Sequence, residues 1–171
     1  MDKHIAKFEK VSYNEFEKSI NNCFPDVFTI PEINHMYANI KLPKRATAGS
    51  AGYDFYSPIT FQLTEENNSI VFPTGIKCQM EQGWMLMIFP RSSMGFKYGV
   101  RLANTTGIID SDFYNNVLNE GNIQVKLCGV TEPMIINAGE RVVQGILLPY
   151  GVAVDDDVTE TRNGGTGSTG A

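Results

Sequence analysis

From Met36 onward the chain is built of short apolar or alternating runs, which Gly, Pro and Asn interrupt at close intervals. Runs of this length between turn-forming residues are typical of β-strands. The candidate strands are residues 37–42, 53–56, 69–72, 76–80, 84–89, 105–109, 123–127 and 141–148. No helix of useful length fits between them, so the pattern predicts an all-β body, which would be a sandwich, a jelly roll or a barrel.

The residues before this body indicate one helix. Ser12 and Glu15 have the S-x-x-E form of a capping box, and Phe16 and Ile20 then follow helical spacing. We expect a short helix over about residues 13–22. Its expected task is to pack Phe16 and Ile20 on the body, and the alternative is that it binds a partner.

By composition the chain divides into an N-terminal extension (residues 1–35), a β domain (residues 36–154) and a Gly-rich C-terminal arm (residues 155–171). The arm has almost no apolar residue to bury, which is typical of a flexible tail. Its glycines would also let backbone N–H groups wrap an anion, with Arg162, Ser168 and Thr169 as further donors. The sequence is consistent with both interpretations.

The net charge of −5 over 171 residues argues against a nucleic-acid binder, which needs an excess of Lys and Arg. The apolar runs are too short to span a bilayer and no signal-peptide pattern is present, so we expect a soluble, cytoplasmic protein without a membrane partner. Three widely spaced cysteines, and two histidines that precede the β domain, disfavour zinc, disulfides and histidine-based catalysis. Catalysis would then rest on carboxylates, arginines, hydroxyls and amides, with a hard metal as a further option.

Asp110 is the first candidate for a catalytic base. It follows an apolar run at the exit of an expected strand, and Asp112 stands two residues further on. A carboxylate at the end of a strand that turns over a pocket can hold and deprotonate a water. The alternative is a turn in which both carboxylates accept hydrogen bonds from the backbone.

Arg91, Ser92 and Ser93 end the most apolar strand and form a candidate phosphate contact. They offer a guanidinium fork and two hydroxyls, although a capped turn with a surface arginine is the alternative. Asn104 precedes Asp110 by six residues, so a β-hairpin here would let its carboxamide and the main chain read a flat amide-like edge. A turn residue chosen for its backbone tolerance is the alternative for Asn104.

Asp54 lies in an apolar strand context, so we expect it to pair with an arginine or to accept backbone hydrogen bonds. Arg141 and Gln144 begin another strand and should point to opposite faces, because side chains alternate along a strand. Only one of them would face a given pocket. We expect Gln144 to contact a ligand and Arg141 to pair with an acid such as Asp54.

These segments, in this order, resemble the five motifs of the trimeric dUTP diphosphatases (dUTPases), in a bacterial or phage-like variant. The matching stretches are Ala51-Gly52-Tyr53-Asp54, Pro90-Arg91-Ser92-Ser93, Gly107-Ile108-Ile109-Asp110-Ser111-Asp112, Arg141-Val142-Val143-Gln144 and Gly164-Gly165-Thr166-Gly167-Ser168-Thr169-Gly170. Together they span residues 51–170. Five ordered matches are a specific signal.

The resemblance implies a homotrimer of jelly-roll or distorted β-barrel subunits, whose three active sites each draw motifs from all three chains. It implies hydrolysis of dUTP to dUMP and pyrophosphate, which limits dUTP and supplies dUMP for thymidylate synthesis. Asp110 would deprotonate the water that attacks the α-phosphorus, a contribution of about 10²–10⁴-fold. Mg²⁺ would bridge the triphosphate oxygens, held mainly by phosphates and water.

The same resemblance implies the substrate contacts. Asn104 and the backbone of Gly107 and Ile109 would read the uracil edge, and the Phe113 ring would exclude a ribose 2′-hydroxyl. The groups that would hold the phosphates are Arg91, Ser92, Ser93 and Gln144. The supporting side chains would be Asp54, Arg141 and Asp112. The arm would close over the γ-phosphate with Arg162, Thr166, Gly167, Ser168 and Thr169.

Three positions depart from the family pattern. Phe113 replaces the usual Tyr, which keeps the ring and loses the hydroxyl. Thr166 replaces a Phe that stacks on the uracil, a loss of about 1–3 kcal/mol. Arg162 lies four residues before Thr166, where the common spacing is five. We therefore expect intact chemistry with a weakened lid.

Two other functions remain open from the sequence. A dUTP-binding regulatory module that contacts a protein partner is favoured by the altered arm, because a binder without fast turnover tolerates a poor lid. A dCTP deaminase shares the architecture but would need a glutamate beside the base pocket, where this chain has Asp110.

Overall fold

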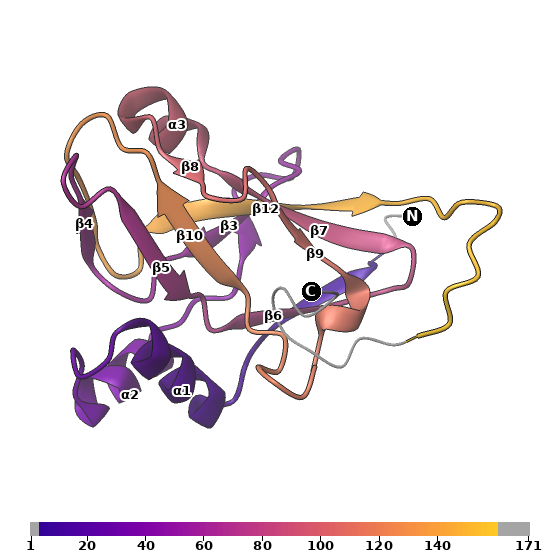
Figure 1. The fold of residues 1–171 in the computed structure, drawn as a ribbon, viewed down its shortest axis with the longest axis horizontal. Coiled ribbons are helices and arrows are strands. Elements are labelled where there is room, and N and C mark those ends of the chain that lie inside the picture. The colour runs from indigo at the N-terminus through magenta and orange to yellow at the C-terminus, as the bar shows by residue number, and fades with distance from the viewer. Residues whose placement is uncertain (1–3, 161–171) are drawn as a thin grey trace.

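The computed structural model describes residues 4–160, which form mainly antiparallel strands (Figure 1). The strands are β1 (Ala6–Lys10), β2 (Lys44–Arg45), β3 (Tyr53–Tyr56), β4 (Phe61–Leu63), β5 (Ser69–Pro73), β6 (Ile76–Met80), β7 (Trp84–Pro90), β8 (Arg101–Leu102), β9 (Gly107–Ile109), β10 (Gln124–Cys128), β11 (Met134–Ile136) and β12 (Arg141–Pro149). The helices are α1 (Tyr13–Cys23), α2 (Ile30–Ala38) and α3 (Ser92–Tyr98), and η1 (Ser111–Phe113) is a 3₁₀ turn. The β-rich body predicted from the sequence is confirmed.

Within the described residues the strands form four sheets. The five-stranded sheet has the order β2-β3-β12-β7-β9, the three-stranded sheet has the order β5-β10-β8, and β1-β6 and β11-β4 are pairs. Phe55, Leu86 and Leu127 are 0% exposed and lie in one core shared by these sheets. At Gly145 a Cβ would lie only 2.9 Å from Phe55 Cε2, so β12 crosses the core where it has no side chain.

Helix α1 confirms the prediction from the capping pattern. Ser12 Oγ accepts a hydrogen bond from the Glu15 N–H at 3.2 Å, which satisfies one of the free donors at the helix start. Phe16 and Ile20 are 0% exposed and belong to the same core as the strands. The helix is thus packed on the body, as expected.

The expected strand over residues 37–42 is wrong, because Tyr37 lies in α2. The Glu32 carboxylate accepts hydrogen bonds from the Thr29 N–H at 2.8 Å and from the Thr29 hydroxyl at 2.7 Å, which fixes the first turn. The ring of Tyr37 packs edge-on against Tyr13 at 5.5 Å between centroids. The capping box at Thr29 and the ring contact between Tyr37 and Tyr13 therefore outweigh the short alternating pattern that suggested a strand.

The extension also contributes a strand that the sequence analysis did not predict. β1 pairs antiparallel with β6, with Phe8 opposite Cys78, and the Phe8 ring contacts Phe55 at 5.6 Å. Figure 1 shows α1 and α2 together at one end of the body, below β5 and β6. In residues 4–160 no helix is long and apolar enough to cross a bilayer.

Candidate active site

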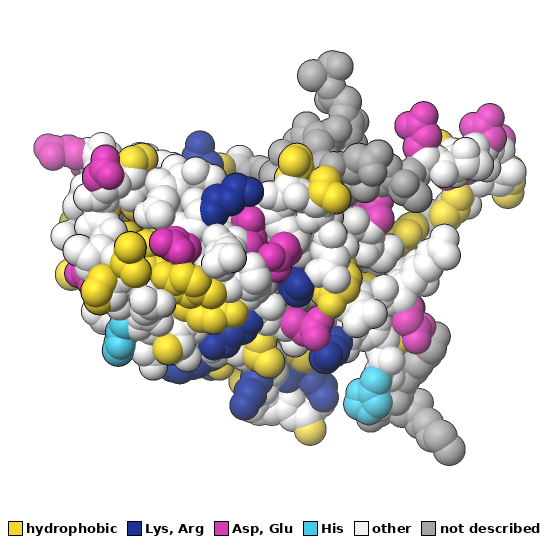
Figure 2. All heavy atoms as spheres, turned by 90° about the horizontal axis from the view of Figure 1, so that it is seen from below, with side chains coloured by type: hydrophobic (Ala, Val, Ile, Leu, Met, Phe, Trp, Pro, Cys, Tyr) yellow, Lys and Arg dark blue, Asp and Glu magenta, His cyan; other side chains and the backbone are white. Residues whose placement is uncertain are grey.

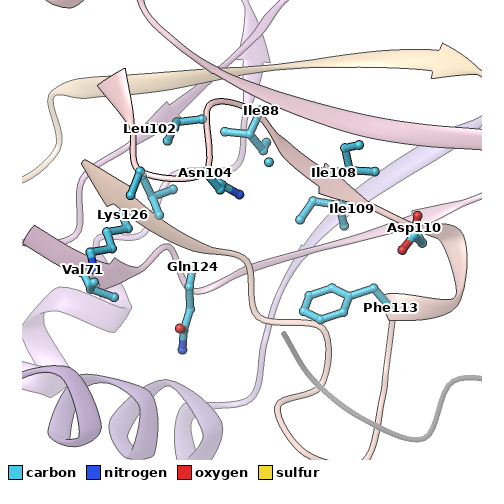
Figure 3. Close-up of a pocket in the computed structure, with 13 residues that line it drawn as sticks. Val71, Ile88, Leu102, Asn104, Ile108, Ile109, Asp110, Phe113, Gln124 and Lys126 are labelled. Atoms are coloured by element: carbon cyan, nitrogen blue, oxygen red, sulfur yellow. The ribbon is translucent and has the colours of Figure 1, made fainter. Parts of the chain in front are cut away.

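A pocket of about 520 Å³ opens where β9, η1 and β10 meet (Figure 3). Five of the expected site residues line it, namely Asn104, Gly107, Ile109, Asp110 and Phe113. In Figure 3 the Phe113 ring reaches into the space beside Ile109, and Asp110 stands at the outer end. The structure therefore brings the candidate base-reading groups together with the candidate water-activating carboxylate.

The segment that carries Asn104 is not the hairpin that the sequence suggested. β8 pairs with β10 and β9 pairs with β7, so residues 103–106 cross from the three-stranded to the five-stranded sheet. Thr105 makes this crossing with a left-handed φ of 65°. A Cβ on Gly107 would lie 3.9 Å from Asn104 Nδ2, so the carboxamide lies beside the start of β9.

The turn η1 fixes Phe113 relative to Asp110. The Phe113 N–H donates to the Asp110 carbonyl at 3.1 Å, which closes the turn. The Phe113 side chain is 4% exposed, and Asn116 Nδ2 donates to the Phe113 carbonyl at 2.8 Å. The Phe113 ring and the Asp110 carboxylate are therefore carried by the same 3₁₀ turn.

Two polar side chains that the sequence analysis did not select, Gln124 and Lys126, line the same pocket from β10. Both are exposed and alternate with the buried Val125 and Leu127. Such alternation is typical of any strand with one face in solvent. Only the tertiary position of β10 next to β9 and η1 identifies them as pocket residues.

A second pocket, of about 490 Å³, lies beside β3, β12 and the end of β7. The expected residues that line it are Asp54, Arg91, Ser92, Ser93, Arg141 and Gln144. Asp54 lies between two guanidinium groups, with Arg91 Nε 3.3 Å from Oδ1 and Arg141 Nη1 donating to Oδ2 at 3.1 Å. The expected Asp54–Arg141 pair is confirmed. Two arginines around one carboxylate leave a net positive charge, which suits phosphate.

Arg141 and Gln144 both line this second pocket, so the expectation that they face opposite sides is wrong. The pairing of β12 with β3 shifts its register between Arg141 and Val143. A bulge adds one residue to one strand and so breaks the alternation of side chains. Gln144 comes to lie opposite Asp54, while Arg141 still reaches the same carboxylate.

The carboxamide of Gln144 occupies its place because residue 52 has no side chain. A Cβ on Gly52 would lie 2.6 Å from Gln144 Oε1. Gln144 Nε2 reaches the Pro90 carbonyl at 3.5 Å, which is a long contact. The orientation of the carboxamide therefore depends on the space above Gly52.

Arg91 precedes a helix of seven residues, α3, in a region where we expected no helix of useful length. α3 runs from Ser92 to Tyr98, and Gly99 follows as its C-terminal cap with a left-handed φ of 68°, which suits a glycine. Ser92 and Ser93 are exposed in its first turn, beside the Asp54–arginine cluster. The two hydroxyls and the Arg91 guanidinium are thus presented by one short element.

The dUTPase family profile matches residues 38–170. The chain is 43% identical over 137 residues to the deoxyuridine 5'-triphosphate nucleotidohydrolase of Lactococcus lactis, an alignment that covers 78% of this chain and 91% of that protein. The chain belongs to the dUTPase family. Among solved structures this dUTPase is similar to the dUTPase from Streptococcus mutans, with 33% identity and a TM-score of 0.62 over 85% of this chain and 97% of that chain.

The fold is also shared with a mutant dUTPase from phage phi11 of S. aureus. That chain is 19% identical, with a TM-score of 0.55 over 71% of this dUTPase and 92% of the phage protein. The resemblance inferred from the five sequence motifs is therefore confirmed by sequence and by fold.

In this dUTPase the expected site residues fall into two groups on the described part of the chain. The linings of the 520 Å³ and 490 Å³ pockets share no residue. Asp112 lies in η1 and is exposed. The expected arm residues Arg162, Thr166, Gly167, Ser168 and Thr169 lie outside the described residues.

Proposed function

We propose that this dUTPase family member hydrolyses dUTP to dUMP and pyrophosphate. A water held at Asp110 attacks the α-phosphorus, the bond from that phosphorus to the bridging oxygen breaks, and the water proton passes to the Asp110 carboxylate. The observation that carries the proposal is the family match over residues 38–170. Support comes from Asp110, which stands at the rim of a pocket that also holds Asn104 and Phe113.

We assign the nucleoside to the pocket of β9 and η1. Asn104 and the backbone of Gly107 and Ile109 would read the uracil edge, since a strand edge offers both donors and acceptors. The buried Phe113 ring would pack on the sugar and leave no room for a 2′-hydroxyl. This assignment predicts strong preference for dUTP over UTP.

We assign the triphosphate to the second pocket. Arg91 and the hydroxyls of Ser92 and Ser93 would donate to phosphate oxygens, and the Gln144 carboxamide would add a neutral donor. Asp54 and Arg141 would support them, because Asp54 fixes both guanidinium groups in place. Arginines held in advance lose less conformational entropy when they bind phosphate.

We propose further that the active form is a homotrimer in which each site combines the two pockets from different chains. The two linings are separate on one chain, which supports this arrangement. Large apolar side chains also stand exposed near each pocket, with Phe96 in α3 93% exposed and Ile108 in β9 57% exposed. Contact with neighbouring subunits would bury such side chains.

We propose Mg²⁺ as the cofactor, bound mainly through the triphosphate and water. The described residues contain no group of three or more His, Cys, Asp or Glu side chains that could hold a metal ion, and Asp54 already pairs with two arginines. Mg²⁺ commonly keeps several waters and binds substrate phosphates. The second pocket, whose one carboxylate is paired with two arginines, fits an ion that is held by the triphosphate and not by protein ligands. The phage phi11 structure reveals the coordination of a structural Mg(II) ion in that protein. When bound, the ion would neutralise charge on the triphosphate.

The decisive experiment is steady-state pyrophosphate release measured side by side with dUTP, dTTP, dCTP and UTP. Turnover of dUTP far above the other three is the expected result. Tight dUTP binding with negligible release would instead indicate a binding module, and release of ammonia from dCTP would indicate a deaminase.

Asp110→Asn tests the catalytic base. This variant should lose most turnover, on the order of 10²–10⁴-fold, while dUTP binding stays measurable. Retained turnover would remove Asp110 from this role. Mixing Asp110→Asn with Gln144→Ala subunits in equal amounts tests the shared site, because about a quarter of all sites would regain both intact residues only if the two residues come from different chains.

A further inference from the structure

The N-terminal segment of residues 6–23 contacts the loop of residues 114–122, which directly follows the Phe113 turn. The family match begins at residue 38, so this segment lies outside it. β1 of the segment pairs with β6, and α1 follows it immediately. No residue of the segment lines the nucleoside pocket, so the segment can act on the pocket only through the loop that follows Phe113.

The first contact joins Glu9 to Tyr114, the residue after Phe113. The Tyr114 hydroxyl donates a hydrogen bond to Glu9 Oε2, and Lys7 Nζ lies 2.6 Å from Glu9 Oε1. The Lys77 ammonium lies over the Tyr114 ring, 5.3 Å from its centroid. Glu9 thus holds the hydroxyl of Tyr114 and Lys77 covers its ring face. The hydrogen bond to Glu9 is strong because its acceptor is a charged carboxylate.

The second contact joins Ser12 to Glu120 at the far end of the loop. The Glu120 carboxylate accepts from the Ser12 N–H at 2.9 Å and from the Ser12 hydroxyl at 2.6 Å. Lys77 Nζ lies 3.6 Å from the same carboxylate and donates to Asn115 Oδ1 at 2.6 Å. Figure 2 shows acidic and basic side chains interspersed over the underside of the molecule.

These contacts join a loop whose backbone is strained at Glu120. Its left-handed φ of 54° costs energy, whereas the φ of 56° at Asn115 is one that Asn adopts readily. The base of the loop is buried, where Asn122 is 0% exposed and its Nδ2 donates to Ser19 Oγ at 3.1 Å. α1 therefore anchors one end of the loop, and β1 anchors the end next to Phe113.

We propose that Glu9 and Tyr114 are positioning residues whose hydrogen bond holds the Phe113 ring against the sugar of the substrate. This inference rests on the proposed function, because it assigns Phe113 to the 2′-position of a deoxyribonucleotide. Phe113 and Tyr114 are adjacent, so a shift of the Tyr114 backbone moves the end of η1 and the ring with it. The N-terminal segment then sets how strictly the pocket excludes ribonucleotides.

The test measures kcat/KM for dUTP and for UTP in Glu9→Ala and in Tyr114→Phe. Each variant should lower the dUTP-to-UTP ratio by roughly three- to tenfold, because a misplaced ring packs less well on the deoxyribose of dUTP and leaves more room for the 2′-hydroxyl of UTP. Glu9→Gln keeps an acceptor for the tyrosine hydroxyl and should restore the ratio. The double variant Glu9→Ala with Tyr114→Phe should match either single variant, since both remove one contact.

Glu32→Ala is the matched control. It removes the cap of α2 in the same N-terminal part of the chain, and no contact described above joins Glu32 to the loop. This control should lower the melting temperature and leave the ratio unchanged. An unchanged ratio in Glu9→Ala and Tyr114→Phe overturns the proposal, and so does an equal fall in Glu32→Ala.

Failure of the positioning role of Glu9 and Tyr114 can be distinguished from failure of the hydrolase assignment. Absence of pyrophosphate release by the unmodified protein would refute the hydrolase assignment. The Kd values for dUTP and UTP, measured by calorimetry on the same variants, then decide the positioning role. A fall in the ratio of affinities in Glu9→Ala that Glu9→Gln restores supports it, and equal ratios refute it.

Discussion

Gly52→Ala should impair activity with little effect on stability, because the added methyl group meets one functional side chain. A Cβ at residue 52 would lie 2.6 Å from Gln144 Oε1, against about 3.4 Å for ordinary van der Waals contact. The carboxamide must therefore move by about 0.8 Å. It is free to do so, since its hydrogen bond to the Pro90 carbonyl is long at 3.5 Å.

The size of the effect follows from this displacement. A misplacement of about 1 Å in a positioned group costs up to roughly 10²-fold in rate. We expect kcat/KM for dUTP to fall about 10- to 100-fold, which is about 1.4–2.7 kcal/mol of transition-state stabilisation. Gly52 does not have a left-handed φ, so alanine fits its backbone and the free energy of unfolding should change by less than about 1 kcal/mol.

The assay is steady-state pyrophosphate release together with urea unfolding. Gly49→Ala is the control, because a Cβ there would meet no atom within 4 Å and the backbone segment is the same. It should leave both activity and stability near those of the unmodified protein. Combining Gly52→Ala with Gln144→Ala separates displacement of the carboxamide from direct obstruction of the phosphate. If the methyl acts through Gln144, the double variant matches Gln144→Ala alone.

An unchanged kcat/KM in Gly52→Ala would refute the reasoning, since the carboxamide would then tolerate the shift. A double variant much worse than Gln144→Ala would also refute it, because the methyl group would then block the substrate directly.

Three further predictions concern stability and reactivity. Asp54→Asn removes the charge between Arg91 and Arg141 and should lower the free energy of unfolding in urea by about 1–3 kcal/mol, a value reduced for the partial exposure of both arginines. The hydrogen bond from the Thr29 N–H lowers the pKa of Glu32 below its ordinary value of 4.5, so Glu32→Gln should be less stable than the unmodified protein near pH 7. This difference should vanish as pH falls through the lowered pKa, since the stabilising form is the ionised one. Burial raises the pKa of the Cys78 thiol to about 12, so a thiol reagent at pH 8 should leave Cys78 unmodified until the protein unfolds.

Local signals in the sequence predicted the elements whose stability is local. The capping pattern at Ser12 predicted α1, and the short runs with their turn residues predicted most of the strands. The Asp54–Arg141 pair followed from the cost of burying an unpaired carboxylate. The start signal of α2 at Thr29 was also in the sequence, but the alternating pattern after residue 36 concealed it.

The order of five motifs along the chain was enough to predict the family. The distribution of the four motifs within residues 4–160 over two pockets could not be predicted, because strand pairing joins residues that are distant in sequence. The bulge between Arg141 and Val143 turns both Arg141 and Gln144 to one pocket, and the crossing of residues 103–106 replaces the expected hairpin. The sequence by itself determined which groups are available for chemistry, since that depends only on residue identity. The tertiary structure decided which of them meet, since register, bulges and the N-terminal contacts behind Phe113 arise only when the whole chain packs.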